Sequence, residues 1–343
     1  LKDVFEDERL LEEKLRFLIG GPDIQIHRPV TIETWKNYLQ EPTSVLAQKA
    51  AAEYRLAIDS QAEACQRVFV RPLTVLAGAA GTGKTTVIRA IVKAIKKGHG
   101  VGSSVIALAP TGKAADRIRE VLDTDSDLKG GVEVQTVHSF LARHGWMNAN
   151  RSFKRSGGKR EDAYTTYILD EASMLDLSLA ATFFRSVHWP SVQRFVLVGD
   201  PHQLPPIGRG KVFSDVIDFV RKAAPESIAT LQHNLRQLKG RVTGGGTGII
   251  ELAQCYIHRP TEGPKNESAS IAAERMMQKI RIGGDVAEDL RILYWKDQDD
   301  LNSMLLEQVE EDMRTDAAEE DKDRLCSPSE LWKVAFDEDP SYM

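Results

Sequence analysis

A glycine-rich stretch from Gly78 to Thr86 carries the residues best suited to binding a phosphate chain. It reads Gly-Ala-Ala-Gly-Thr-Gly-Lys-Thr-Thr, which fills every position of the G-x-x-x-x-G-K-[ST] pattern. Glycines let the backbone approach a polyphosphate closely, and the loop amides and the following helix N-terminus supply positive charge. We predict that Lys84 reaches the β- and γ-phosphates and that the Thr85 hydroxyl binds Mg²⁺. The predicted nucleotide-binding residues of the stretch are Gly78, Gly81, Thr82, Gly83, Lys84, Thr85 and Thr86.

Two adjacent carboxylates, Asp170 and Glu171, follow an apolar run at residues 164–169. In a protein with a phosphate loop, an aspartate at a strand end can hold Mg²⁺, directly or through water. The neighbouring glutamate can orient and deprotonate the attacking water. Two neighbouring acids alone are a weak signal, but their place after a phosphate loop and an apolar strand predicts a metal ligand, Asp170, and a general base, Glu171.

Two further polar side chains are candidates for contacting the reacting phosphate. Gln203 lies in a loop at residues 199–210 that prolines stiffen and glycines allow to turn, and it could sense the γ-phosphate or the attacking water. The alternative for this loop is a rigid surface turn. Arg236 follows the last apolar run, at residues 227–231, and could stabilise charge on the transferred phosphate as an arginine finger does. An arginine after a strand is common, so its position alone leaves an ordinary surface role open.

Gln61 lies shortly before the strand that leads into the phosphate loop. It stands at the start of a helix that Ser60 and Glu63 are predicted to begin as a capping box. A glutamine amide can donate to one adenine nitrogen and accept from the exocyclic amine. A solvated helix residue is the simpler alternative, because glutamine is usually exposed.

Two other stretches contain residues that suit contacts to a nucleic-acid backbone. Pro110 and Thr111 end the run at residues 104–109, and Thr136 and His138 belong to residues 134–141. Hydroxyl and amide donors at the ends of strands can bind phosphate oxygens. For His138, which lies near a phenylalanine, a structural role is the commoner alternative.

Residues 143–163 form the most basic stretch of the chain, with no acid before Glu161. We predict a two-stranded hairpin or a mobile loop here. Basic and aromatic residues together suit a nucleic-acid contact, through phosphate pairing and base stacking. A solvated surface insertion fits the composition equally well. The candidate contacts are Trp146, Phe153, Lys154 and Arg155.

Composition limits the classes of protein to consider. The chain has 343 residues, 42% of them hydrophobic, which is enough for two or three packed domains. Its net charge is −5, so a nucleic-acid partner must be bound locally and not by overall charge. Three widely spaced cysteines give no metal-binding pattern and favour a reduced, cytoplasmic setting. No apolar run is long enough to span a bilayer, and the charged N-terminus does not fit a secretory signal. We expect no membrane partner.

The elements that must position these side chains are short apolar runs followed by amphipathic helices. Five such runs predict strands at residues 73–77, 104–109, 164–169, 194–198 and 227–231. Strands that alternate with helices predict an α/β fold with a parallel sheet flanked by helices. A mostly polar helical module is predicted for residues 1–58, a nucleotide-binding domain for 59–240 with the basic insertion at 143–163, and a linker with the start of another domain for 241–343. The chain lacks an initiator methionine, so we expect a fragment of a longer protein.

Taken together, these stretches resemble the superfamily 1 DNA helicases of the RecD-like, 5′→3′ branch, over about residues 59–255. Gln61 matches the family's adenine-reading glutamine, residues 78–86 match motif I, residues 109–115 match motif Ia, and residues 136–140 match the next DNA-contact motif. Residues 170–174 match motif II, residues 199–205 match motif III, and residues 235–237 match motif IV. The resemblance implies a RecA-like phosphate-loop fold, ATP and Mg²⁺ as ligands, and an adenine contact for Gln61. It also implies an arginine finger at Arg236 and a strand-parting hairpin at residues 143–163.

The chain also departs from this family. The family's second motor domain carries a T-x-H-x-x-Q-G-like motif and a late T-R-A-like motif, and neither is found here. In this family ATP binds between two motor domains, so residues 1–343 would hold half of the site. We therefore expect weak ATP binding, little hydrolysis and no unwinding from these residues alone.

The expected partners are single-stranded DNA, or a duplex with a single-stranded tail, and subunits of a recombination or repair complex. A nucleotide-gated DNA-binding or assembly module without unwinding activity is the alternative. A ring-forming AAA ATPase is disfavoured, because that class would place a polar sensor residue in the wholly apolar run at residues 195–198.

Overall fold

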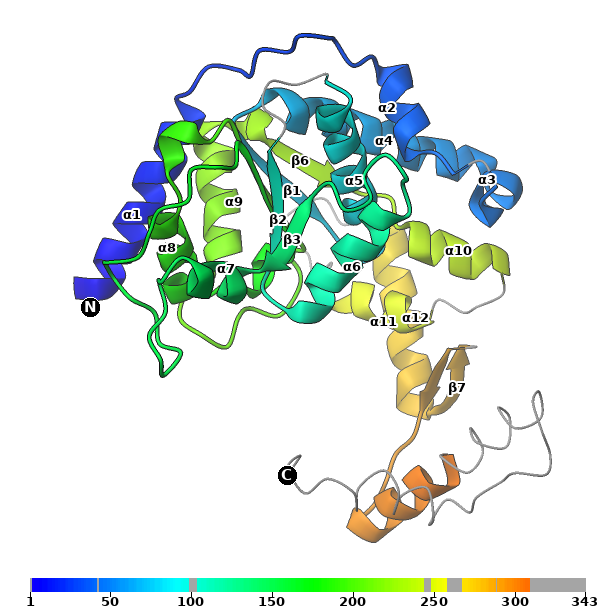
Figure 1. Cartoon of the computed structure of the whole chain (residues 1–343). Coiled ribbons are helices and arrows are strands. Elements are labelled where there is room, and N and C mark those ends of the chain that lie inside the picture. The colour runs from blue at the N-terminus through cyan, green and yellow to red at the C-terminus, as the bar shows by residue number, and fades with distance from the viewer. Residues whose placement is uncertain are drawn as a thin grey trace, which may run out of the picture. The chain divides into compact units, whose positions relative to one another are not determined.

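The computed structural model describes residues 2–41, 43–98, 104–243, 248–257, 267–287 and 289–308 (Figure 1). The chain divides into two compact units, residues 1–247 and residues 248–343. Every residue singled out above lies in the first unit. Among the described residues, no helix has the length and apolar character needed to cross a bilayer.

The first unit is built on a six-stranded sheet in which every pair of neighbouring strands is parallel. The strand order is β3-β2-β4-β5-β1-β6. The strands are β1 (Leu73–Gly78), β2 (Val105–Ala109), β3 (Glu133–Thr136), β4 (Thr166–Leu169), β5 (Arg194–Gly199) and β6 (Ile228–Leu231). Strands β1, β2, β4 and β5 are buried along their whole length, as expected for a parallel sheet with both faces covered. The predicted α/β class and parallel sheet are confirmed.

Helices cover both faces of this sheet and complete two hydrophobic cores (Figure 1). Side chains alternate along β1, so that Val75 and Ala77 enter one core while Leu76 enters the other. The first core takes in α1 (Lys2–Ile19), α7 (Val137–Arg143), α8 (Leu177–Ser186) and α9 (Val212–Ala223). The second takes in α2 (Ile32–Leu39), α3 (Val45–Lys49), α4 (Ala51–Val70), α5 (Lys84–Lys96) and α6 (Gly112–Asp123). Three short 3-10 helices, η1 (Ala172–Met174), η2 (Trp189–Ser191) and η3 (Pro225–Ser227), link these elements.

Helix α4 differs from the sequence expectation. The helix start predicted at Ser60 is wrong, because a single helix runs from Ala51 to Val70. Its buried residues Ile58, Ala62, Cys65 and Phe69 keep an apolar stripe through the expected break, and the burial of that stripe outweighs the local capping signal. The predicted domain boundary between residues 58 and 59 therefore falls inside a helix that packs in the second core.

The second unit contains α11 (Gly248–Ile257), α12 (Glu267–Ile282) and the antiparallel pair β7 (Gly284–Ala287) and β8 (Leu290–Ile292). A further helix covers residues 298–308. Tyr294 donates a hydrogen bond of 2.6 Å from its hydroxyl to the Ile280 carbonyl, which ties the chain after β8 to α12.

Candidate nucleotide site and nucleic-acid interface

The carboxyl ends of the six parallel strands lie along one edge of the sheet, and the predicted site residues follow these ends. The phosphate loop follows β1, Asp170 follows β4, and Asp200 follows β5. Helix α10 (Leu235–Thr243), which contains Arg236, follows β6 after three residues. In open parallel sheets, ligands bind outside this edge. The topology therefore brings together residues that are far apart in sequence.

The phosphate loop is a tight turn that only glycine fits at two positions. Gly81 and Gly83 have φ angles of 85° and 86°, in the left-handed region. A Cβ atom on Gly83 would lie 2.2 Å from Nε2 of Gln61, and one on Gly81 would lie 2.6 Å from Cβ of Arg236. A side chain at either glycine would therefore collide with another predicted site residue. Gly78 is similarly confined, because a Cβ atom there would lie 2.6 Å from Oγ1 of Thr82.

Lys84 turns back into the curve of the loop. Its ammonium donates to the carbonyls of Gly78 and Ala79, at 2.8 and 3.2 Å, and the residue is 8% exposed. The Thr82 hydroxyl also donates to Ala79, at 2.9 Å. Thr85 and Thr86 lie in the first turn of α5, whose N–H groups have no carbonyl one turn earlier. This buried ammonium beside open helix amides fits a phosphate chain.

The two carboxylates occupy a strained turn directly after β4. Asp170 is 6% exposed, and burial raises its pKa to about 6, helped by the charge of Glu171 and opposed by a hydrogen bond and the nearby Lys84 and Arg117. Glu171 has a φ of 50°, a left-handed conformation that costs a non-glycine residue about 1–3 kcal/mol. Its N–H donates to Oδ1 of Asp170 at 2.9 Å. Oε2 of Glu171 is buried and has no hydrogen-bond partner among the described residues. An unsatisfied buried acceptor beside a buried carboxylate fits a site built for a cation and a water molecule.

Gln203 is connected to the turn that contains the carboxylates. The Ser173 hydroxyl donates to Oε1 of Gln203 at 3.1 Å, and the Gln203 N–H donates to the Asp200 carbonyl at 3.2 Å. With its oxygen engaged, the exposed side chain keeps its NH₂ group for an acceptor such as a phosphate oxygen. The role of Gln203 at the phosphate stays a prediction.

Two residues that the sequence analysis did not assign hold the phosphate loop. The buried Asp200 carboxylate accepts from the N–H groups of Ala80, at 3.1 Å, and His202, at 3.0 Å. The Asn234 side chain donates to the Ala80 carbonyl at 3.0 Å. Both had a signal in the sequence, since Asp200 follows an apolar strand as Asp170 does, and Asn234 stands before a helix as capping residues do.

Arg236 and Gln61 both lie against the phosphate loop. Arg236 is exposed, and its main-chain N–H is 3.3 Å from the Gly81 carbonyl. Gln61 is only 1% exposed, and its Nε2 donates to the Thr82 carbonyl at 3.0 Å. Oε1 of Gln61 has no partner within the described ranges. The alternative of a solvated helix residue is therefore wrong for Gln61, whereas the adenine contact stays a prediction.

The candidate DNA contacts at the ends of β2 and β3 begin two helices. Oγ1 of Thr111 accepts from the Ala114 N–H at 3.3 Å, and Oγ1 of Thr136 accepts from the Ser139 N–H at 3.1 Å. These hydroxyls cap α6 and α7, whose N-termini favour anions. Pro110 is half-buried just before Thr111, and the exposed His138 lies in the first turn of α7. Their contact with DNA stays a prediction.

The basic insertion contains a small hairpin, in which Met147 and Phe153 form an antiparallel bridge. The Phe153 ring lies 5.8 Å from the exposed His138 ring. Trp146 is only 4% exposed, and its indole N–H donates to the Lys159 carbonyl at 2.7 Å. A Cβ atom on Gly158 would lie 2.4 Å from the Trp146 ring. Trp146 thus anchors the insertion, and this burial does not fit the prediction that it stacks on a base.

The two basic side chains at the end of the hairpin already have partners. Lys154 donates to the Gly145 carbonyl at 2.9 Å, which closes the base of the hairpin. Arg155 lies against α1, with nitrogen–oxygen distances of 2.9 Å to Glu6, 3.3 Å to Asp7 and 3.5 Å to Asp3. A phosphate could reach the Arg155 guanidinium fully only by displacing these carboxylates.

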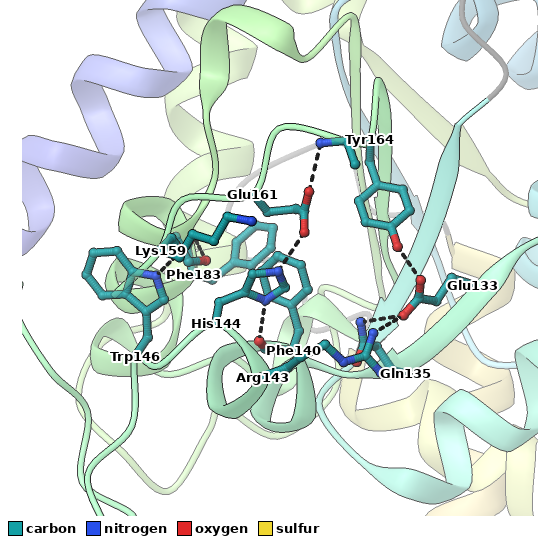
Figure 2. A network of polar contacts seen from close by, with 12 residues as sticks. Glu133, Gln135, Phe140, Arg143, His144, Trp146, Lys159, Glu161, Tyr164 and Phe183 are labelled. Carbon is teal, nitrogen blue, oxygen red and sulfur yellow. Dashed lines mark hydrogen bonds and ion pairs between the residues drawn. The ribbon is translucent and has the colours of Figure 1, made fainter. Parts of the chain in front are cut away.

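A partly buried polar network fixes the insertion onto α7 (Figure 2). Nδ1 of His144 lies 2.7 Å from the Phe140 carbonyl, and Nε2 lies 2.6 Å from the Glu161 carboxylate. Both partners are acceptors, so each ring nitrogen can bond only when it carries a proton. Glu161 also accepts from the Ala163 N–H at 2.7 Å. Burial alone would raise the pKa of Glu161, but the hydrogen bonds from Ala163 and His144 outweigh it and leave this pKa below its ordinary value of 4.5.

We expect Glu161→Gln to lower the free energy of unfolding by about 1 kcal/mol at pH 7, because an uncharged amide has one accepting oxygen for the two bonds that Glu161 accepts from His144 and Ala163. A lowered pKa means that the contribution of Glu161 is present above its ordinary pKa and is lost as pH falls through the lower, folded-state value. The difference between the two proteins should therefore shrink as the pH falls below 4.5. Chemical denaturation at pH 7 and below pH 4.5 measures this difference in unfolding free energy. Glu120→Gln, on the exposed side of α6, is the control. An equal difference at every pH would contradict this assignment.

Comparison with known proteins places the chain in a family. A family model described as an AAA domain matches residues 57–243, which is more than half of the chain. An uncharacterized protein of Methanocaldococcus jannaschii is 28% identical over 295 residues, covering 82% of this chain and 23% of that protein. The RecBCD enzyme subunit RecD of Mycolicibacterium smegmatis is 31% identical over 256 residues, covering 68% of this chain and 45% of the subunit.

Among solved structures, the alignment with the Pif1 helicase from Candida albicans covers 66% of this chain and 55% of the helicase chain, with 20% identity and a TM-score of 0.34. The chain spans less than half the length of the two relatives named above. The description of the family model names a domain and says nothing of ring formation. The matched residues 57–243 include the phosphate loop, the paired carboxylates and Gln203. The chain therefore belongs to the AAA domain family, and within that family it is a superfamily 1, RecD-like helicase motor domain.

Proposed function

We propose that this chain binds ATP with Mg²⁺ and single-stranded DNA, and that it is the first motor domain of a 5′→3′ RecD-like DNA helicase. The proposal rests on hydrogen bonds that join three loops at the carboxyl edge of the sheet. Ser173 joins the carboxylate turn to Gln203, and Asp200 joins the Gln203 loop to the phosphate loop. Hydrolysis coupled to movement needs such communication between the phosphate and the DNA-binding segments.

Each polar residue at this edge has a role in the proposed hydrolysis. Lys84 would leave the carbonyls of its own loop for the β- and γ-phosphate oxygens, while Thr85 and Asp170 would hold Mg²⁺. Mg²⁺ held there would supply positive charge beside the phosphates. Oε2 of Glu171, which has no partner among the described residues, would accept a proton from the attacking water, and Gln203 would orient that water. Arg236, attached through its main chain to Gly81, would stabilise charge on the transferred phosphate.

Single-stranded DNA, or the single-stranded tail of a duplex, would lie across the ends of β2 and β3. Thr111, Thr136 and His138 would contact its phosphates beside the N-termini of α6 and α7. Phe153, beside His138, offers a face for stacking.

A second candidate is a nucleotide-gated DNA-binding or assembly subunit of a recombination or repair complex, without unwinding activity of its own. Two observations favour it. Two relatives are described as subunits of the RecBCD enzyme, and Arg155 of the hairpin is held by carboxylates of α1.

A strand-displacement assay separates the two candidates. The natural full-length protein is given ATP, Mg²⁺ and duplexes that carry either a 5′ or a 3′ single-stranded tail. Displacement of the 5′-tailed duplex alone supports the helicase with this polarity. ATP-dependent DNA binding without displacement, with or without partner subunits, supports the second candidate. Absence of saturable ATP binding would contradict both.

A further inference from the structure

The phosphate loop is held at Ala80 by groups from two different strands of the sheet. Ala80 donates its N–H to the Asp200 carboxylate after β5, and its carbonyl accepts from the Asn234 side chain after β6. The next carbonyl, that of Gly81, accepts from the N–H groups of Leu235 and Arg236, at 2.9 and 3.3 Å. Neither Asp200 nor Asn234 belongs to the G-x-x-x-x-G-K-[ST] pattern.

From these contacts we infer that Asn234 is a positioning residue for the phosphate loop, which it fastens to the start of α10. This inference rests on the proposed nucleotide binding. Asp200 occupies the Ala80 N–H, and the Thr82 N–H donates to the Ala79 carbonyl at 3.3 Å, so the loop amides left to bind phosphate are the others that follow Ala80. The Asn234 bond fixes the peptide from which those amides start. The loop is thereby preorganised, and little ordering is needed when nucleotide binds.

The contact between Asn234 and the phosphate loop also affects the position of Arg236. A Cβ atom on Gly81 would lie 2.7 Å from Oδ1 of Asn234 and 2.6 Å from Cβ of Arg236, so the loop and the helix start are in direct contact. Since the Arg236 N–H bonds to Gly81, the base of the arginine side chain follows any shift of the loop. Asn234 thus couples the candidate arginine finger to the phosphates that Lys84 would bind.

Asn234 has a second, purely structural role, which an experiment must separate from the first. Its Oδ1 accepts from the Gln237 N–H at 3.0 Å and caps α10, whereas its Nδ2 donates to Ala80. Threonine is a good capping residue, but its hydroxyl lies one bond closer to the backbone than the asparagine amide nitrogen. Asn234→Thr therefore keeps the cap and loses the bond to Ala80. Asn234→Asp keeps the cap and the length but sets a carboxylate oxygen against the Ala80 carbonyl.

The test is titration of the natural full-length protein with a fluorescent ATP analogue in the presence of Mg²⁺, together with thermal unfolding. We expect Asn234→Thr to weaken binding about 3- to 10-fold, the equivalent of one hydrogen bond, without a change in the unfolding midpoint. Asn234→Asp should weaken it further, because it adds negative charge beside the phosphates. Thr31→Ala, which removes the cap of α2, should lower the midpoint and leave affinity unchanged.

The outcomes separate this inference from the function on which it rests. Wild-type affinity in Asn234→Thr would overturn the positioning role and leave the proposed function standing. A loss of affinity that Thr31→Ala reproduces would overturn it too, because stability and not position would then be the cause. If the wild-type protein itself binds no nucleotide, both the function and the inference fall.

Discussion

Replacement of Lys84 by alanine is expected to weaken the binding of ATP·Mg²⁺ by about 10- to 100-fold, which corresponds to the loss of charge-assisted hydrogen bonds to the phosphates. The ammonium is the one charged group on the described phosphate loop, and its present partners are two carbonyls of that loop. Alanine offers neither charge nor donor there. Titration with a fluorescent ATP analogue measures the change in the natural full-length protein.

The control for this variant lies on the same helix. Lys96 is exposed in the last turn of α5, so Lys96→Ala removes the same charge at the far end from the phosphate loop. Its affinity should match that of the wild type. Because Lys84→Ala also removes the ammonium donor from the Gly78 and Ala79 carbonyls, unfolding curves should accompany the titration. Unchanged affinity in a folded Lys84→Ala protein would show that phosphate is not bound in this loop.

Glu171→Gln should bind ATP with near-normal affinity yet lower its turnover by about 10²- to 10⁴-fold, the usual contribution of a general base. The amide keeps the size of the carboxylate, so the left-handed turn and the bond from the Glu171 N–H to Asp170 can persist. It cannot take a proton from water. Phosphate release under saturating ATP measures turnover, and the titration used for Lys84→Ala measures binding.

Glu120→Gln is a matched control for Glu171→Gln, because it makes the same chemical change at an exposed site on α6. Turnover by Glu171→Gln within a few-fold of wild type would remove Glu171 from the role of base. A parallel loss of affinity and turnover would instead indicate that the carboxylate serves mainly in binding.

Local sequence patterns were enough to predict five of the six strands and the polar residues that follow them. The apolar runs before Gly78, Asp170 and Gly199 each formed a strand, because residues of this kind are buried on both faces of a parallel sheet. A polar residue directly after such a run then lies at the carboxyl edge, whatever the order of the strands. The order itself has no local signal and came only from the structure.

Contacts between distant segments could not be predicted in this way. Gln61 is buried because the phosphate loop folds over α4, and Trp146 is buried because residue 158 lets the chain close over its ring. Arg155 meets Glu6 across 149 residues of sequence. Composition identifies such side chains as polar, aromatic or basic, but their exposure depends on which segments meet in the folded chain.

The cluster of α1 carboxylates around Arg155 has a consequence for the conditions under which the hairpin works. Exposed ion pairs weaken as ionic strength rises, and so do contacts between arginine and DNA phosphates. Moderate salt would therefore weaken the pairs of Arg155 with the exposed Asp3 and Glu6, just as it screens a DNA phosphate, whereas the pair with the buried Asp7 is screened less. At low salt the α1 carboxylates and a DNA phosphate compete for the Arg155 guanidinium. Arg155 would therefore add little to the salt dependence of DNA affinity.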